Sequence, residues 1–128
     1  MKIEHFAYQV AEPPAVTDWY CEHLGFSVKR AGNDVAQTYF LADESGQVMI
    51  EIYANPAIEV PPYRDMNPLT LHLAFVCDDI PQTIERLQQV GATIAVETMI
   101  TPIGDELVML RDPWGMAIQL CNRAQRLV

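Results

Sequence analysis

Hydrophobic and polar positions change period in the same order twice along the chain. Alternating residues typical of a strand fill segment 3–10, and a helical stripe of apolar residues follows at 13–24. The same succession returns at 71–78 and 80–90. After each helix come strand-like runs separated by turn residues, which we place at 26–30, 35–42 and 47–54 in the first half and at 93–98, 106–111 and 116–121 in the second. The pattern predicts two successive βαβββ units.

Residues that favour helix boundaries lie at the ends of both predicted helices. The first helix begins at Pro13, and Gly25 follows it with the conformational freedom that a helix end requires. In the second helix, Asp79 can accept hydrogen bonds from the first free N–H groups, and Pro81 lies in the first turn. Gly91 then ends that helix.

Landmarks of the two halves are separated by a near-constant offset of 66 to 69 residues. The matching pairs are His5 with His72, Gly25 with Gly91, Gly46 with Gly115, and Glu51 with Gln119. Four such pairs in the same order indicate an internal repeat. The repeat predicts an α+β fold in which two tandem βαβββ modules form a curved mixed-sheet cup, with one helix packed on each sheet.

A proline-rich stretch divides the two halves. Segment 56–68 contains four of the nine prolines and is predicted to be an extended linker, because proline disfavours both helices and central strands. We therefore expect one domain composed of a first module at 1–55, this linker, a second module at 69–122 and a tail at 123–128.

Composition and charge restrict the function. The chain has 128 residues, of which 50% are hydrophobic and 20% charged, as in globular proteins. Its net charge of −9 opposes binding to nucleic acid or to anionic membranes, and its N-terminus resembles a strand more than a signal peptide. Cys21, Cys77 and Cys121 are odd in number and have no CxxC spacing, which favours free thiols in a cytoplasmic protein.

One metal-capable side chain is predicted on the open face of each of four strands. Alternation leaves His5, Glu51, His72 and Gln119 opposite the apolar faces of their strands. Taken singly, each is an ordinary surface or core residue of a strand. Their equivalent places in the repeat favour a shared site for one divalent ion such as Ni, Zn, Co, Mn or Fe, bound by two imidazoles, a carboxylate and a carboxamide oxygen.

The order of these motifs resembles the vicinal oxygen chelate superfamily, also called the glyoxalase/bleomycin-resistance/dioxygenase superfamily. The resemblance extends from Met1 to about Asn122 and includes Trp-Tyr and Leu-Gly-Phe in the first half and Asp-Pro-Trp-Gly in the second. Within that superfamily the chain is most similar to short bacterial glyoxalase I-like proteins, whose metal ligands follow the order His, Glu, His, Glu. The resemblance assigns the corresponding positions to His5, Glu51, His72 and Gln119.

The resemblance also implies substrate-binding positions and two departures from the glyoxalase I pattern. Asn55 falls where glyoxalase I has an asparagine that helps to hold glutathione. Gln9 stands where the family tends to have an arginine that contacts a glutathione carboxylate, and Gln119 replaces a glutamate that binds metal and carries a proton. Methylmalonyl-CoA epimerases have a similar ligand set with the halves exchanged, so Glu51 can supply the single carboxylate from the other half.

The predicted function is that of a metal-dependent glyoxalase I-like lyase or isomerase. It would remove a proton next to a carbonyl of a small chelated substrate, with Glu51 as catalytic base. Three alternatives remain open: a non-haem iron dioxygenase that uses His5, His72 and Glu51, a metal-free small-molecule binding protein of the antibiotic-resistance type, and a fosfomycin- or thiol-transferase-like metalloenzyme. The exposed edges of small curved sheets further predict a homodimer.

Overall fold

The chain divides into two compact units. A computed structural model describes residues 1–47 and 49–128. The units are Met1–Pro61 and Pro62–Val128, so the boundary lies within the proline-rich segment. In the portion of the chain that the structure describes, no helix combines the length and hydrophobicity needed to cross a bilayer.

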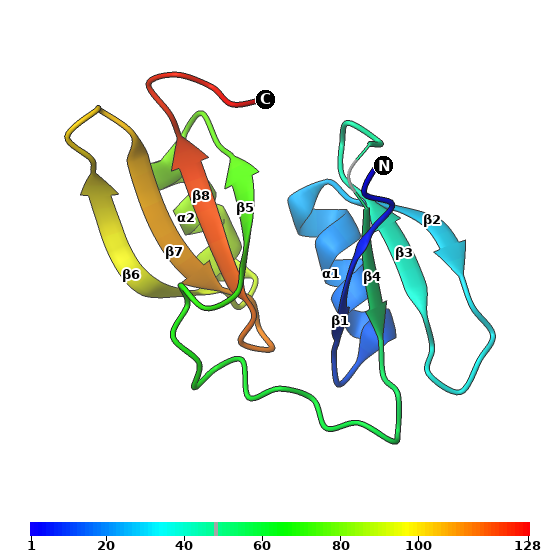
Figure 1. The fold of residues 1–128 in the computed structure, drawn as a ribbon. Helices are drawn as coiled ribbons and strands as arrows, with labels where there is room; N and C mark the ends of the chain where they lie inside the picture. Colours follow the sequence, from blue (N-terminus) through cyan, green and yellow to red (C-terminus); the bar gives the residue numbers. More distant parts are fainter. Residues whose placement is uncertain (48) are drawn as a thin grey trace. The chain divides into compact units, whose positions relative to one another are not determined.

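Each unit has the element order βαβββ (Figure 1). The first unit contains β1 (Phe6–Gln9), α1 (Pro13–Leu24), β2 (Ser27–Ala31), β3 (Tyr39–Ala42) and β4 (Met49–Tyr53). The second contains β5 (His72–Val76), α2 (Ile80–Gln89), β6 (Thr93–Ile100), β7 (Glu106–Arg111) and β8 (Ala117–Asn122). The tandem βαβββ fold predicted from the sequence is therefore confirmed.

Both units build the same mixed sheet. The strand orders are β1-β4-β3-β2 and β5-β8-β7-β6. In each sheet the first strand runs parallel to the last, and the other pairs are antiparallel. The connection between the two parallel strands contains the helix and the other two strands, and the helix packs against one face of its sheet (Figure 1). The helix of each unit does not cover the opposite face of its sheet, which we call the open face.

The helices begin and end where the sequence predicts. Helix α1 buries Val16 and Tyr20 completely, and Gly25 ends it with a left-handed φ of 75°. Asp79 caps the start of helix α2, because its side chain accepts a hydrogen bond of 3.0 Å from the backbone N–H of Gln82. These contacts satisfy backbone groups that each helix leaves free at its ends.

Two predicted strands of the first unit are shorter than the sequence pattern indicates. The segment predicted at 35–42 forms a strand only over Tyr39–Ala42, because the Asp34 carboxylate accepts hydrogen bonds from the backbone N–H and the hydroxyl of Thr38 and stabilises a turn there. The segment predicted at 3–10 forms a strand only over Phe6–Gln9. Of the predicted strand 47–54, Val48 lies outside the described residues.

Arg111 fixes the start of the second unit to its sheet. Its guanidinium donates hydrogen bonds of 2.7 Å to the Tyr63 carbonyl and 2.6 Å to the Met66 carbonyl. Gly115 lies at φ 99°, and a Cβ there would approach the backbone N of Arg64 to 2.8 Å. Glycine is therefore required where the segment passes closely over the turn before β8.

Candidate functional site

His5 and Glu51 form a pair at the open face of the first sheet. His5 immediately precedes β1, and Glu51 lies in the neighbouring parallel strand β4. The Nε2 atom of His5 is 3.2 Å from Oε2 of Glu51, and their side chains are 30% and 21% exposed. Because Ile50 and Ile52 on either side of Glu51 are buried, alternation directs the carboxylate away from the helix.

The other ring nitrogen of His5 also has a carboxylate partner. Oε2 of Glu4 is 2.8 Å from Nδ1 of His5. The His5 ring additionally makes an edge contact with Phe40, which pairs with Glu51 across β3 and β4. When Nδ1–H donates to Glu4, the neutral ring presents the lone pair of Nε2 toward Glu51. This orientation suits a metal ligand or a proton acceptor.

His72 and Gln119 are the corresponding residues of the second unit. They lie in the neighbouring parallel strands β5 and β8. Nδ1 of His72 is buried and has no hydrogen-bond partner among the described residues. A buried imidazole nitrogen without a partner carries a desolvation cost, which a bound ion or ligand would relieve.

The Gln119 side chain is held by Cys121. The thiol of Cys121 lies 3.3 Å from Oε1 of Gln119 and can donate a weak hydrogen bond to it. Burial raises the pKa of the Cys121 thiol, and the nearby guanidinium of Arg123 opposes this effect. The thiol is therefore protonated at neutral pH and acts as a donor. This leaves Oε1 oriented as an acceptor on the open face.

The strand registers of the two pairs are equivalent. Ala7, two residues after His5, pairs with Glu51, and Ala74, two residues after His72, pairs with Gln119. Each unit thus presents one imidazole and one side-chain oxygen at the same register of the same sheet edge. The internal repeat predicted from the sequence is present at the level of individual residues.

The spacing of His5 and Glu51 is compatible with two ligands of one divalent ion. Two atoms that each lie about 2.0–2.2 Å from one ion, at angles near 90–109°, are roughly 3–3.5 Å apart. The 3.2 Å between the His5 and Glu51 atoms matches this spacing. Within residues 1–47 and 49–128, no three His, Cys, Asp or Glu side chains are placed so that they could hold one metal ion. Each unit by itself offers two of the four predicted ligands.

Gln9 and Asn55, predicted to bind substrate, are brought together by hydrogen bonds. The Gln9 side chain is buried, and its amide donates to the carbonyl of Ile58 and accepts a 3.1 Å bond from the backbone N–H of Asn55. Oδ1 of Asn55 accepts a 3.0 Å bond from the backbone N–H of Ala57. The Gln9 side chain therefore holds the turn after β4 against β1, and the Asn55 side chain stabilises the turn itself.

Replacing Gln9 by leucine is expected to destabilise the first unit by about 1–2 kcal/mol, because the change leaves the Asn55 N–H and the Ile58 carbonyl without their partner. Urea unfolding followed by circular dichroism would measure the loss. Gln88→Leu, at an exposed position of α2, is the matched control and should change stability by less than about 0.5 kcal/mol. Equal stability of the two variants would contradict an anchoring role for Gln9.

Several partners of the candidate ligands were missed by sequence reasoning. Glu4 is adjacent to His5, and a neighbouring carboxylate was a signal that could have suggested an orienting partner. Cys121 lies two residues after Gln119 in one strand, so alternation already placed both on one face. The contact between Phe40 and His5 depends on strand pairing and had no local signal.

Comparison with known families agrees with this architecture. Residues 2–120 match the Glyoxalase/Bleomycin resistance protein/Dioxygenase superfamily. The chain belongs to this superfamily, which defines its class of fold. A search of curated protein sequences gives no match.

Solved structures with the same fold come from diverse organisms. A glyoxalase family protein from Bacillus cereus superposes with a TM-score of 0.79 at 16% identity, over 94% of this chain and 93% of that one. An antibiotic binding protein from Streptomyces sp. CB03234 gives 0.67 at 25% identity, over 94% and 96%. A glyoxalase I mutant from Zea mays gives 0.74 at 22% identity, over 97% of this chain and 46% of that one.

Proposed function

We propose that this protein is a metal-dependent lyase or isomerase that removes a proton from the carbon next to a carbonyl of a small chelating substrate. The observation that carries the proposal is the 3.2 Å pair between Nε2 of His5 and Oε2 of Glu51. His72 and Gln119 occupy the equivalent strand positions of the second unit. A carboxylate beside an imidazole on an open sheet face has the chemistry of a metal-binding and proton-accepting site.

The four residues have separable roles in this proposal. His5, His72 and Gln119 would hold the ion, whose chemistry is that of a Lewis acid for neighbouring substrate oxygens. Glu51 accepts the carbon-bound proton and returns it at a different atom. When Nδ1–H of His5 donates to Glu4, the lone pair that would bind the ion is on Nε2. Gln119 has no proton to accept or release at neutral pH, so the proton step falls to Glu51 alone.

Glutathione adducts are expected to be poor substrates. Gln9 carries no charge, and both ends of its amide are already engaged with the turn at residues 55–58. It cannot form the charge-assisted bond that an arginine makes to a carboxylate. We therefore favour a substrate without a glutathione moiety.

Metal analysis of the purified full chain by mass spectrometry tests the proposal directly. The expected result is one equivalent of a divalent transition metal per site, lost on dialysis against a chelator and regained on addition of the metal. Protein that takes up no metal when Ni, Co, Zn, Mn and Fe are each supplied would refute the metal-dependent function.

A metal-free small-molecule binding function is the second candidate. The 25% identity to an antibiotic binding protein and a largely apolar pocket in the second unit favour it. Chelator-treated protein would then bind its ligand as tightly as untreated protein. Under the first candidate, chelation would abolish binding of a chelating substrate.

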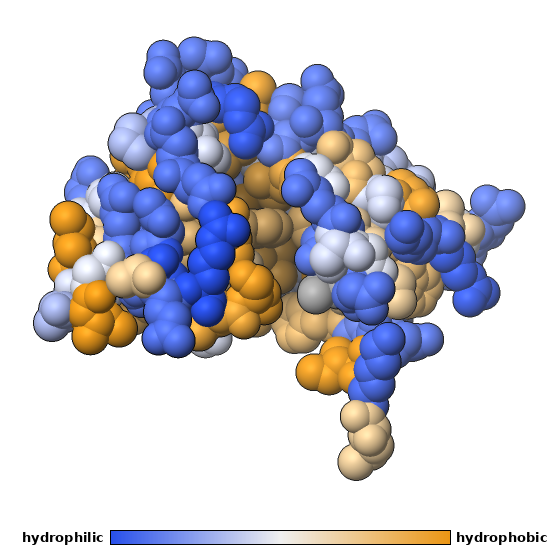
Figure 2. Space-filling model, turned by 90° about the horizontal axis from the view of Figure 1, so that it is seen from above, coloured by the Kyte–Doolittle hydropathy of each residue, from blue (hydrophilic) through white to orange (hydrophobic). Residues whose placement is uncertain are grey.

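We also propose that the protein forms a homodimer. Hydrophobic residues remain at the surface among predominantly hydrophilic ones (Figure 2). They include Met99 and Ile100 of the edge strand β6, which are 52% and 74% exposed. An exposed apolar edge strand favours pairing with a second copy. Light scattering at micromolar concentration should give twice the mass of 14.4 kDa, and a monomeric mass would refute pairing.

A further inference from the structure

A pocket lies on the open face of the second sheet, the same face that carries Gln119. Val76 pairs with Cys121 in the neighbouring strand. By alternation, Val76 lies on the same face of β5 as His72, and Cys121 lies on the same face of β8 as Gln119. The Cys121 thiol reaches back to Gln119, which shows that the two side chains share this face. The opposite face is closed, since Ile118 and Leu120 of β8 are buried. One wall residue of the pocket, Cys121, therefore contacts the predicted ligand Gln119.

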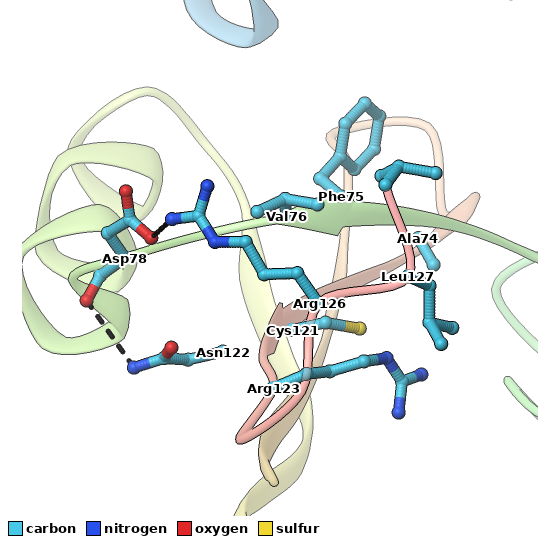
Figure 3. A pocket seen from close by; sticks show the side chains of 10 residues that line it. Ala74, Phe75, Val76, Asp78, Cys121, Asn122, Arg123, Arg126 and Leu127 are labelled. Atoms are coloured by element: carbon cyan, nitrogen blue, oxygen red, sulfur yellow. Dashed lines mark hydrogen bonds and ion pairs between the residues drawn. The ribbon is translucent and has the colours of Figure 1, made fainter.

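The pocket is small and largely apolar. Its volume is about 190 Å³, and its walls include Ala74 and Val76 of β5, Cys121 of β8 and Leu127 of the tail (Figure 3). Sites that enclose a whole drug-sized ligand have volumes of roughly 300–1,000 Å³, whereas an apolar cavity of about 150 Å³ is enough for benzene. The pocket thus has room for one ring or one branched alkyl group.

The charged side chains that line the pocket are paired with carboxylates or guanidinium groups. The Arg123 guanidinium donates a 2.6 Å bond to Asp105, whose other oxygen accepts from the backbone N–H of Ala124. Arg126 reaches across the rim to the carboxylate of Asp78 (Figure 3). These bonds hold the segment 123–128 as a wall and neutralise both arginines. An uncharged group therefore fits the pocket better than an ion does.

We propose that this pocket is a specificity subsite for one uncharged, ring-sized apolar group of the ligand. That the group belongs to a substrate held by His72 and Gln119 rests on the proposed function, but the affinity of the pocket for an apolar group does not. A ligand whose reactive oxygens lie at the open face would extend its apolar substituent along Ala74 and Val76 toward the tail. The size limit excludes burial of a large polycyclic ligand in this pocket alone.

Benzyl alcohol is a suitable probe, because it is uncharged and carries a single ring. Titration of the chelator-treated full chain, followed by amide NMR, should shift residues 74–78, 119–123 and 126–128 with a Kd on the order of 1–10 mM. Glycerol serves as the polar control and should not shift the signals of these residues. Absence of shifts up to about 50 mM benzyl alcohol would overturn the proposal.

Filling the pocket tests whether binding occurs there. Val76→Trp places a bulky side chain into the pocket from a position that is 52% exposed, and it should weaken benzyl alcohol binding at least about tenfold. Val96→Trp is the matched control, since Val96 is 43% exposed in the same unit but does not line the pocket, and it should bind like the wild type. Unchanged binding by Val76→Trp would refute the proposal.

A second variant covers the case in which the tryptophan disturbs the fold. Leu127→Asp, at a position that is 78% exposed, adds a charge to the pocket wall and should weaken probe binding by a similar factor. Because the titration uses metal-free protein, its outcome is independent of the proposed metal chemistry. Probe binding without metal uptake would refute the enzyme proposal alone, and metal uptake without probe binding would refute the pocket alone.

Discussion

Glu51→Gln is expected to lower kcat/KM by about 10²–10⁴-fold on any substrate that the protein turns over. Glutamine keeps the size of the side chain and one oxygen that can bind a metal, but it cannot accept a proton. Loss of a positioned proton-transfer group typically has an effect of this size. The 3.2 Å contact with His5 also loses the charge of the carboxylate. Steady-state kinetics with a saturating supply of metal would measure the effect, and metal content would be determined in parallel.

The equivalent registers of the two units allow a stronger test. If either half can supply the carboxylate, the double variant Glu51→Gln/Gln119→Glu should recover activity that Glu51→Gln lacks. Gln119→Glu alone should raise turnover of the methylglyoxal–glutathione adduct, provided that the wild type is weak on it. Robust wild-type turnover of that adduct, unchanged by Gln119→Glu, would show that Glu51 suffices and that the substitution at 119 is neutral.

Gln82 on the exposed face of α2 provides the matched control for these carboxylate changes. Gln82→Glu adds the same charge as Gln119→Glu at an exposed position of the second unit. It should leave kcat/KM within about twofold, because surface charges that make no contact with the site act weakly and are screened by salt. A gain in Gln82→Glu equal to that in Gln119→Glu would assign the effect to net charge and not to the position of the carboxylate.

Most of the fold could be predicted from local sequence patterns, because the same patterns occur in both units. The helix from Pro13 to Leu24 begins and ends where the proline and Gly25 predict, and Asp79 caps α2 as expected. These signals act over a few residues and need no knowledge of the tertiary structure. The predicted strand ends were less accurate where a side chain bonds a backbone group that strand pairing would otherwise use. Asp34 does this before β3.

The candidate ligands could be proposed from the sequence, whereas the residues that contact them could not. Alternation and the repeat placed His5 and Glu51 on one face, and the strand register brings them to 3.2 Å. Gln9 has the same alternation as His5, yet it is buried by a turn 46 to 49 residues further along the chain. A contact of that kind depends on how the segment after β4 folds back, which has no periodic signature. The pocket likewise needs the tail at 123–128 to fold over the sheet.

His72→Ala is expected to weaken metal binding by at least about 100-fold. Removal of an outer partner of a metal ligand typically costs about 10–100-fold in affinity, so removal of a ligand should exceed that range. His5→Ala should have an effect of the same size, since the two imidazoles are equivalent in the repeat. Titration calorimetry with Ni²⁺ or Zn²⁺ on chelator-treated protein would measure both. Loss of affinity in only one variant would show that the two units do not contribute to one site.

Variants of His23 and Glu4 are the controls for these measurements of metal affinity. His23 lies in α1 against Trp19, away from the His5–Glu51 pair, so His23→Ala should retain wild-type affinity.

Glu4→Gln keeps a hydrogen-bond acceptor for Nδ1 of His5 but removes the charge. Because Glu4 is 80% exposed, its effect should be below about tenfold and should shrink as salt is raised. Glu59→Gln, at another exposed carboxylate of the first unit, should change affinity less than Glu4→Gln does. An equal effect of both glutamate changes would assign the loss to the general negative charge of the chain and would contradict a specific orienting role for Glu4.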